Sequence, residues 1–201
     1  MSALLALKEH VADLDPVVTK LVAGTGAARD AFNRHSRSSM EEMQNLSRTA
    51  AQEIEAALKK LEGEKAQAAA AEFQRLSGIY KHLQIMSQSM GALADPIQKK
   101  IKDGVLFSDK AVAQTNYLFD TQAGLLRSVL DIFKTDNEFL KIYTESEARN
   151  LIQTCSNFAT EHETRLIEGL CQPQAAPLFL AILENIRIMG QQERDIVKLL
   201  A

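Results

Sequence analysis

Few residues of this chain have the type and spacing that catalysis or metal binding requires. Di-iron helical bundles bind metal through Glu-x-x-His, a motif that puts two ligands on one face of a helix. That motif is absent, because none of the four histidines has a glutamate three positions earlier; they are His10, His35, His82 and His162. Since His162 lies on an apolar helical stripe, we interpret it as a hydrogen-bonded core or boundary histidine, and less favourably as a ligand or general base.

Two other patterns could bind a ligand. Gly24-Thr25-Gly26 lacks the further glycines of a phosphate-binding loop and follows no predicted strand, so we exclude a nucleotide site there. Met86, Met90 and Met189 could form a soft-metal site or a promiscuous binding groove. They occupy core positions of helical repeats, and core packing is therefore the favoured interpretation.

Composition limits the class of protein. The 201 residues are 46% hydrophobic and 24% charged with a net charge of −3, which is typical of a soluble globular protein and argues against nucleic-acid binding. The sequence contains no 18-residue apolar run, so we predict no membrane span. The apolar stretch Met1–Lys8 is followed too closely by Glu9, Asp13 and Asp15 to be a secretory signal. Cys155 and Cys171 would lie roughly 24 Å apart if one helix ran through both, too far for a disulfide. We therefore expect a reducing, cytoplasmic location.

Apolar residues recur at three- and four-residue steps along almost the whole chain, and this periodicity predicts six helices. Gly24-Thr25-Gly26 is expected to end the first helix, Asp15-Pro16 to interrupt it, and Asp95-Pro96 to kink or split the third. Asp103-Gly104 is the predicted domain boundary. The predicted helices span residues 2–22, 27–61, 64–102, 108–134, 136–170 and 174–201.

Two segments half the chain apart carry nearly the same residues. Leu83–Leu93 and Ile186–Ile196 are offset by 103 residues, far more than a common solenoid repeat. The sequence therefore predicts an internal duplication, residues 1–103 and 104–201. The expected fold is all-α, with two antiparallel three-helix bundles, and the expected buried residues include Leu83, Met86, Ile186 and Met189.

The second half also resembles a known family. Glu161–Cys171 reads Glu-His-Glu-Thr-Arg-Leu-Ile-Glu-Gly-Leu-Cys, and Asn185–Gln192 reads Asn-Ile-Arg-Ile-Met-Gly-Gln-Gln. Together they resemble the PhoU family, in particular the PhoU-like domains attached to bacterial sodium/phosphate cotransporters. The resemblance is good over residues 107–201, weaker over 40–102, and does not place residues 1–39. It implies two three-helix bundles related by duplication, in agreement with the repeat.

Several positions depart from the family's metal-binding pattern. When Gly190 and Ile196 are aligned with the family motif, its Asp falls on Gln191, its His on Gln192 and its Glu-Arg pair on Arg187-Ile188. The equivalent Asp position of the first repeat is Gln88. The acidic candidates that remain are Glu9 with Asp13, four residues apart, and Glu145 with Glu147. Because amides are weak ligands for hard cations, we predict degenerate metal sites and assign no catalytic, cofactor-binding or metal-binding residue.

Three functional classes follow. The resemblance implies a regulatory protein of phosphate transport or phosphate signalling. Such a protein would bind a membrane phosphate transporter or a sensor kinase at its cytosolic face. Self-association into a homodimer is compatible with this function. The first alternative is a helical scaffold or signalling adaptor without phosphate control. The second is an enzyme or metal-binding bundle, which the absent ligand motifs disfavour.

Overall fold

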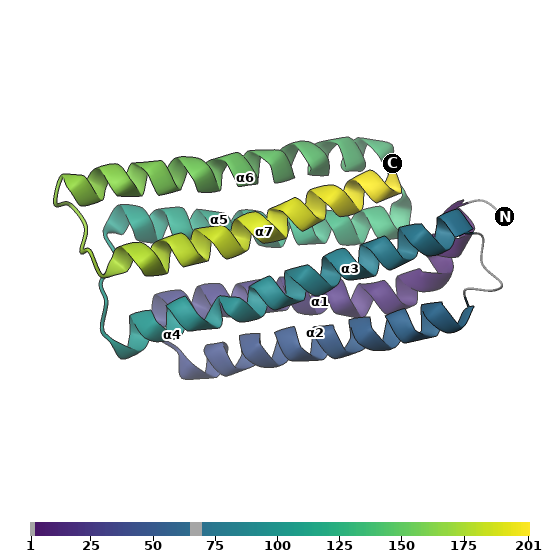
Figure 1. The fold of residues 1–201 in the computed structure, drawn as a ribbon, viewed down its shortest axis with the longest axis horizontal. Coiled ribbons are helices and arrows are strands. Elements are labelled where there is room, and N and C mark those ends of the chain that lie inside the picture. The colour runs from purple at the N-terminus through teal and green to yellow at the C-terminus, as the bar shows by residue number, and fades with distance from the viewer. Residues whose placement is uncertain (1–2, 65–69) are drawn as a thin grey trace.

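The computed structural model describes the backbone of residues 3–64 and 70–201 and the side chains of residues 12–63 and 70–201. Within these residues it contains seven α-helices and no strand. The helices lie side by side along one long axis (Figure 1). Their bounds are α1 (Ala3–Arg34), α2 (Arg37–Glu64), α3 (Ala70–Ala92), α4 (Ala94–Lys102), α5 (Asp109–Thr135), α6 (Glu138–Ile167) and α7 (Ala175–Leu200).

Helices α3 and α4 are the two parts of one predicted helix. Only Leu93 separates them, and its N–H donates to the Met90 carbonyl at 3.2 Å, three residues back, as in a tighter turn. Pro96 follows in the first turn of α4 and has no N–H to continue the α-helical ladder. The predicted break at Asp95-Pro96 is confirmed, and α3 with α4 counted as one helix gives the six predicted.

The predicted break at Gly24-Thr25-Gly26 is wrong, because α1 runs through it to Arg34. Thr25 is buried and donates its hydroxyl hydrogen to the Leu21 carbonyl at 2.9 Å, within the helix. Gly24 serves close packing, since a Cβ there would lie 2.3 Å from Met90 Sδ. Helix α1 also continues through Pro16, so Asp15-Pro16 does not interrupt it.

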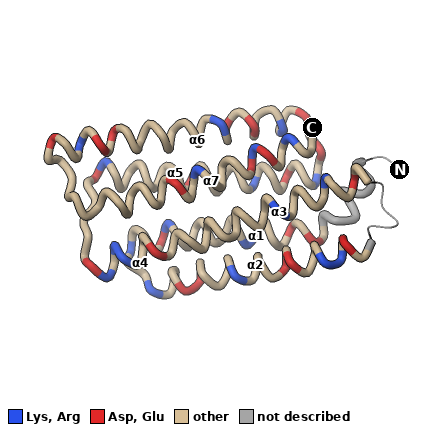
Figure 2. The backbone as a smooth tube through the Cα atoms, in the orientation of Figure 1, with Lys and Arg blue, Asp and Glu red and all other residues tan. Residues whose placement is uncertain are grey.

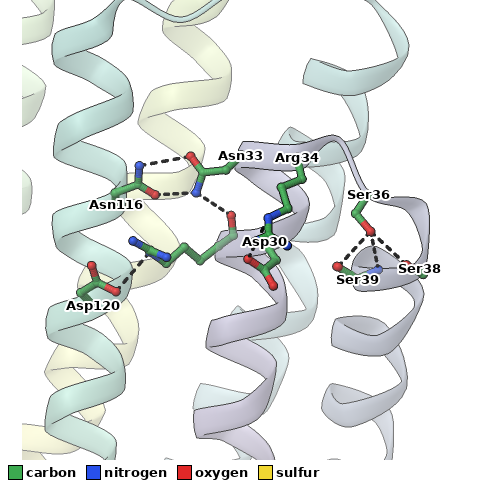
Figure 3. Close-up of polar contacts among 9 residues, drawn as sticks. Asp30, Asn33, Arg34, Ser36, Ser38, Ser39, Asn116 and Asp120 are labelled. Carbon is green, nitrogen blue, oxygen red and sulfur yellow. Dashed lines mark hydrogen bonds and ion pairs between the residues drawn. The ribbon is translucent and has the colours of Figure 1, made fainter.

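The connection between α1 and α2 lies at His35-Ser36 instead. His35 has a φ of 53°, a left-handed conformation that stops a helix. Ser36 then caps α2, because its Oγ accepts a hydrogen bond from the Ser39 N–H at 3.1 Å. Figure 3 shows Ser36 with Ser38 and Ser39 at this helix start.

The predicted ends of the last three helices are confirmed to within a few residues, whereas residues 65–69, where the third predicted helix begins, lie outside the described residues. Ser108 caps α5 through a 3.3 Å hydrogen bond from the Ala111 N–H. Asp136, with a φ of 51°, ends that helix, and Asn137 caps α6 by accepting from the Leu140 N–H. Helix α7 begins after the predicted turn at residues 171–173.

The two halves of the chain share one hydrophobic core. Helix α1 packs against α5, and α3 packs against α7; the Phe32 and Phe119 rings meet edge to face across the first of these contacts. The four predicted core residues Leu83, Met86, Ile186 and Met189 are fully buried, which confirms them. Ile142 has the apolar spacing of its helix but is 69% exposed, so it does not belong to this core. The division at 103/104 and the superposition of residues 83–93 on 186–196 stay predictions.

A polar contact also joins the halves. Asn33 on α1 and Asn116 on α5 exchange two amide hydrogen bonds, at 2.7 and 3.1 Å. One turn away, Arg29 Nε lies 3.1 Å from Asp120 Oδ1. Figure 3 shows the two amides facing each other between the helices. Among the described residues, no helix is long and apolar enough to cross a membrane.

Candidate interaction surface

Two helices end in the same backbone motif at one end of the bundle. After α4, the Gly104 N–H donates to the Ile101 carbonyl and the Val105 N–H to the Lys100 carbonyl. After α6, the Gly169 N–H donates to Leu166 and the Leu170 N–H to Arg165. This paired pattern, with a left-handed glycine, is the Schellman motif; the glycine φ angles are 62° and 72°.

The residue after each glycine is apolar, but only one of the two is buried. In a Schellman motif this residue usually packs back on the helix. Val105 is 5% exposed, and it packs against Ala175 and Leu178 of α7. Leu170 is 62% exposed. Its apolar side chain therefore projects to solvent from a hydrogen-bonded backbone turn.

A cleft lies beside the first of these turns. It has a volume of about 520 Å³ and lies between the connection after α4 and the start of α7. Leu106, on the same connection, is exposed. Leu170, Leu106 and the cleft form what we call the loop-end surface, and Figure 1 shows both connections at the same end of the bundle. The residues that line the cleft are Lys99, Asp103, Val105, Gln174 and Pro177.

His162 lies in the core next to this surface. It is buried as predicted, its ring centroid lies 4.7 Å from that of Phe179, and its Nδ1 lies 3.9 Å from the Cys171 sulfur. Burial, with Arg165 nearby, lowers the pKa of His162, so the imidazole is neutral near pH 7. Both cysteines are free thiols. The geometry favours the structural interpretation, in which His162 holds the residue after Leu170 against α7.

Lys100 anchors α4 in a similar way. Its buried ammonium donates to the Phe32 carbonyl at 3.0 Å and lies 2.7 Å from His35 Nε2. It also lies 4.8 Å from the centroid of the Phe32 ring. Burial lowers the pKa of Lys100. These contacts connect the end of α1 to α4, next to the connection that carries Leu106.

A second group of polar residues lies inside the bundle on α7. Glu193 is fully buried, and one of its carboxyl oxygens accepts from the Gln122 amide at 2.7 Å. Its other oxygen, Oε2, and Gln122 Oε1 have no partner in the structure. Desolvation raises the pKa of Glu193 well above its usual range. The sequence analysis missed this residue, although its signal was a glutamate between Met189 and Ile196 on the apolar stripe.

The neighbouring family positions are not arranged as a metal site. Gln192 contacts His82 Nδ1 at 2.8 Å between α7 and α3, and Gln191 donates to Asp195 at 2.7 Å. Arg187 makes two hydrogen bonds to Glu184. Gln88, the equivalent position of the first repeat, is exposed.

The acidic candidates are not brought together. Asp13 accepts from Lys60 at 2.9 Å between α1 and α2, whereas Glu145 and Glu147 bind Arg149 and Asn150 within α6. Helix α6 contacts neither α1 nor α2. The side chain of Glu9 lies outside the described residues. Across the part of the chain that is described, no three His, Cys, Asp or Glu side chains form a metal-binding group.

The comparisons with known proteins agree with this arrangement of helices. No protein-family model matches the chain, and no curated protein sequence does. The crystal structure of the phosphate transport system regulatory protein PhoU from Streptococcus pneumoniae is similar over 99% of this chain and 95% of its own, with a TM-score of 0.83 and 13% sequence identity. The fold is PhoU-like.

A second solved structure leads to the same conclusion. PhoU from Pseudomonas aeruginosa covers 98% of this chain and 95% of its own length, with a TM-score of 0.76 and 14% identity. The predicted all-α PhoU-like fold is confirmed.

The departures from the PhoU metal pattern give a testable prediction. A divalent ion beside Gln191 and Gln192 would have too little negative charge around it to offset the cost of its dehydration. We expect protein purified without chelator to contain no stoichiometric iron, zinc or manganese. EDTA should leave its melting temperature unchanged, because only a ligand that binds the native state raises it. Elemental analysis that finds one metal ion per chain would contradict this and direct attention to Glu9, Asp13, Glu145 and Glu147.

Proposed function

We propose that this chain is a bacterial, cytoplasmic regulator of phosphate transport or phosphate signalling that acts by binding another protein and not by catalysis. The observation that carries the proposal is the likeness, over almost the full length of both chains, to a phosphate transport system regulatory protein. The polar groups described above support it, because Glu193, His162 and Lys100 bind side chains or backbone of the chain itself and lie within the fold.

The partner in this proposal is a membrane phosphate transporter, or the sensor kinase that responds to it, contacted at its cytosolic face. The loop-end surface is suited to such a contact. Leu106 and Leu170 are exposed apolar residues at this end of the bundle, and the cleft between the connection after α4 and the start of α7 can accept a partner's side chain. A few such anchors, surrounded by polar residues, supply most of the affinity of a typical protein interface.

The test combines binding with phosphate physiology. Deletion of the gene from its host is expected to alter phosphate uptake or the phosphate-starvation response, and the intact gene should restore it. Leu106→Asp with Leu170→Asp should not restore it, and should weaken binding to the host's phosphate transporter in nanodiscs by roughly tenfold or more, because a charge replaces each anchor.

The matched control is Ile85→Asp, which changes an exposed residue on α3 and should behave as wild type. An unchanged phosphate response after deletion, with no binding to the transporter or the kinase, would contradict the proposal. That result would favour the scaffold alternative, which the glutamines at the family's metal positions already suggest. A phosphate transporter gene adjacent to this one would support the regulatory role.

A further inference from the structure

Cys171 is a partly exposed thiol at the end of the bundle where the loop-end surface lies. It belongs to the connection from α6 to α7 and directly follows Leu170. Residues 169–174 carry no charge, and Figure 2 shows this connection in tan. Since the exposure of Cys171 is intermediate, a small reagent from solution can contact its sulfur without meeting a charged side chain on this stretch.

A buried imidazole faces this thiol. His162 Nδ1 lies 3.9 Å from the Cys171 sulfur, within reach of a weak S–H···N hydrogen bond. His162 is 1% exposed, and its other ring nitrogen, Nε2, has no hydrogen-bond partner in the structure. Among the described residues, the thiol is therefore the one hydrogen-bond partner of His162. Because buried polar groups are normally paired throughout, this arrangement indicates a function for the imidazole at the sulfur.

The neutral imidazole is suited to take a proton from the sulfur. Burial, with Arg165 nearby, lowers the pKa of His162, so the ring is uncharged near pH 7 and has a nitrogen free to accept. Nothing donates to Nε2, and so nothing fixes the ring hydrogen on Nδ1. A thiol becomes a nucleophile when an adjacent base removes its proton. The contact that holds the connection against α7 thus also activates Cys171.

Cys155 provides the contrast within the same chain. It is 2% exposed in the core, and burial raises its pKa to about 12. Because the thiolate is the reactive form of cysteine, Cys155 stays inert while the chain is folded. The two thiols therefore differ in access to solvent and in the presence of a base.

We propose that Cys171 is a redox-modification site, at which a low-molecular-weight disulfide such as glutathione disulfide forms a mixed disulfide with the protein. As the Cys171 sulfur attacks one sulfur of the reagent, its proton passes to His162 Nδ1. The S–S bond of the reagent breaks, and the leaving thiolate takes the proton, so that one thiol is released for each mixed disulfide formed. A free thiol reverses the reaction by the same path. Reversible disulfides of this kind are the ones expected in a reducing compartment.

The modification changes the loop-end surface. Cys171 follows Leu170, so the mixed disulfide places a charged peptide beside this exposed apolar residue. It also removes the hydrogen through which the sulfur contacts His162. We expect the modified chain to bind the partner of the proposed function less tightly. This effect on binding rests on the proposed function, whereas the chemistry at Cys171 does not.

The first test measures how fast glutathione disulfide modifies each cysteine, by mass spectrometry of the peptides. In the folded protein Cys171 should react and Cys155 should not. Cys171 should also react roughly tenfold faster, or more, in the folded protein than in protein unfolded in urea, because folding alone brings His162 to the sulfur. Cys155 of the unfolded chain gives the rate of an ordinary thiol. A Cys171 rate that is equal or lower in the folded protein would overturn the proposal.

His162→Gln tests the proton acceptor. It should lower the rate at Cys171 by roughly tenfold or more, and circular dichroism checks that the helices stay folded. The matched control is His82→Gln, the same substitution at a histidine that contacts Gln192 between α3 and α7, and it should leave the rate unchanged. An unchanged rate in folded His162→Gln protein would contradict the role of His162. If that variant does not fold, the comparison of folded and unfolded wild type decides.

The second test measures binding to the host's phosphate transporter in nanodiscs. Glutathione disulfide should weaken binding of the wild type by roughly tenfold or more, and a thiol reductant should restore it. Cys171→Ser should bind equally well with and without the reagent. Equal binding by modified and unmodified wild type would exclude regulation through Cys171. No binding by the unmodified chain would count against the proposed function alone, and the rate measurements would still decide whether Cys171 is the modification site.

Discussion

Glu193→Gln is expected to raise the free energy of unfolding above about pH 5, by an amount that grows with pH. Desolvation raises the pKa of Glu193 in the folded chain, whereas the unfolded carboxyl titrates near its ordinary value of 4.5. Below pH 4.5 both states bind the proton. As the pH rises, the unfolded state loses it and the folded state keeps it, so the wild type loses stability until the pH reaches the folded pKa.

The glutamine variant removes this dependence at the site. Its amide can accept from the Gln122 amide, as Glu193 does at 2.7 Å, and can donate to Gln122 Oε1, which has no partner in the structure. The difference between variant and wild type should therefore increase with a slope approaching about 1.4 kcal/mol per pH unit. Urea unfolding from about pH 5 to pH 8 measures it. Other titrating groups are the same in both proteins and cancel.

Glu184→Gln is the matched control. Glu184 lies on the same helix, is exposed, and has a pKa that the hydrogen bond from Arg187 lowers. A lowered pKa gives stability that is present above the unfolded pKa and is lost as the pH falls. The difference between this variant and wild type should therefore stay constant above about pH 5. A Glu193→Gln difference that is equally flat would mean that Glu193 is ionised in the folded chain.

The apolar periodicity was sufficient to predict the helices, but not to predict where each helix begins and ends. The apolar repeat predicts α5 and α6 closely, because their N-caps, Ser108 and Asn137, are side chains that hydrogen-bond within a few residues. Gly24 led to a wrong helix end because a glycine is needed there for packing against another helix and not for a turn. It makes room for Met90, and no pattern within α1 indicates which side chain packs there.

The loop-end surface was not predictable for a related reason. Asp103-Gly104-Val105 and Glu168-Gly169-Leu170 have the same pattern of an acid, a glycine and an apolar residue, and both form the same turn. Whether the last residue is buried depends on what packs above it. Val105 contacts Ala175 and Leu178, whereas Leu170 has no such cover, and the sequence near either turn does not encode this difference.

The family alignment located α7 correctly but not the chemistry of its polar residues. Aligning on Gly190 drew attention to Gln191 and Gln192, which form ordinary hydrogen bonds. Glu193, the next residue, is a buried ionisable group, and it lies on the apolar stripe between Met189 and Ile196. The sequence shows that an acidic residue lies on the apolar stripe. It does not show that no other charged group lies near this residue, because that depends on how α5 packs against α7.

Ile186→Ala is expected to lower the free energy of unfolding by about 2–5 kcal/mol. Ile186 is fully buried on α7 and belongs to the core that α3 and α7 share between the two halves. Truncation removes its apolar contacts and leaves a cavity that surrounding helices fill only in part. Chemical denaturation at constant pH measures the change.

Ile85→Ala is the same substitution at a position that is 39% exposed on α3, where we expect a smaller change, within about 1 kcal/mol. Equal effects of the two substitutions would contradict the packing of α3 against α7. Since one core spans both halves, Ile186→Ala should also leave a single unfolding transition. Two separate transitions, with only one shifted, would instead show that residues 1–103 and 104–201 unfold as independent units.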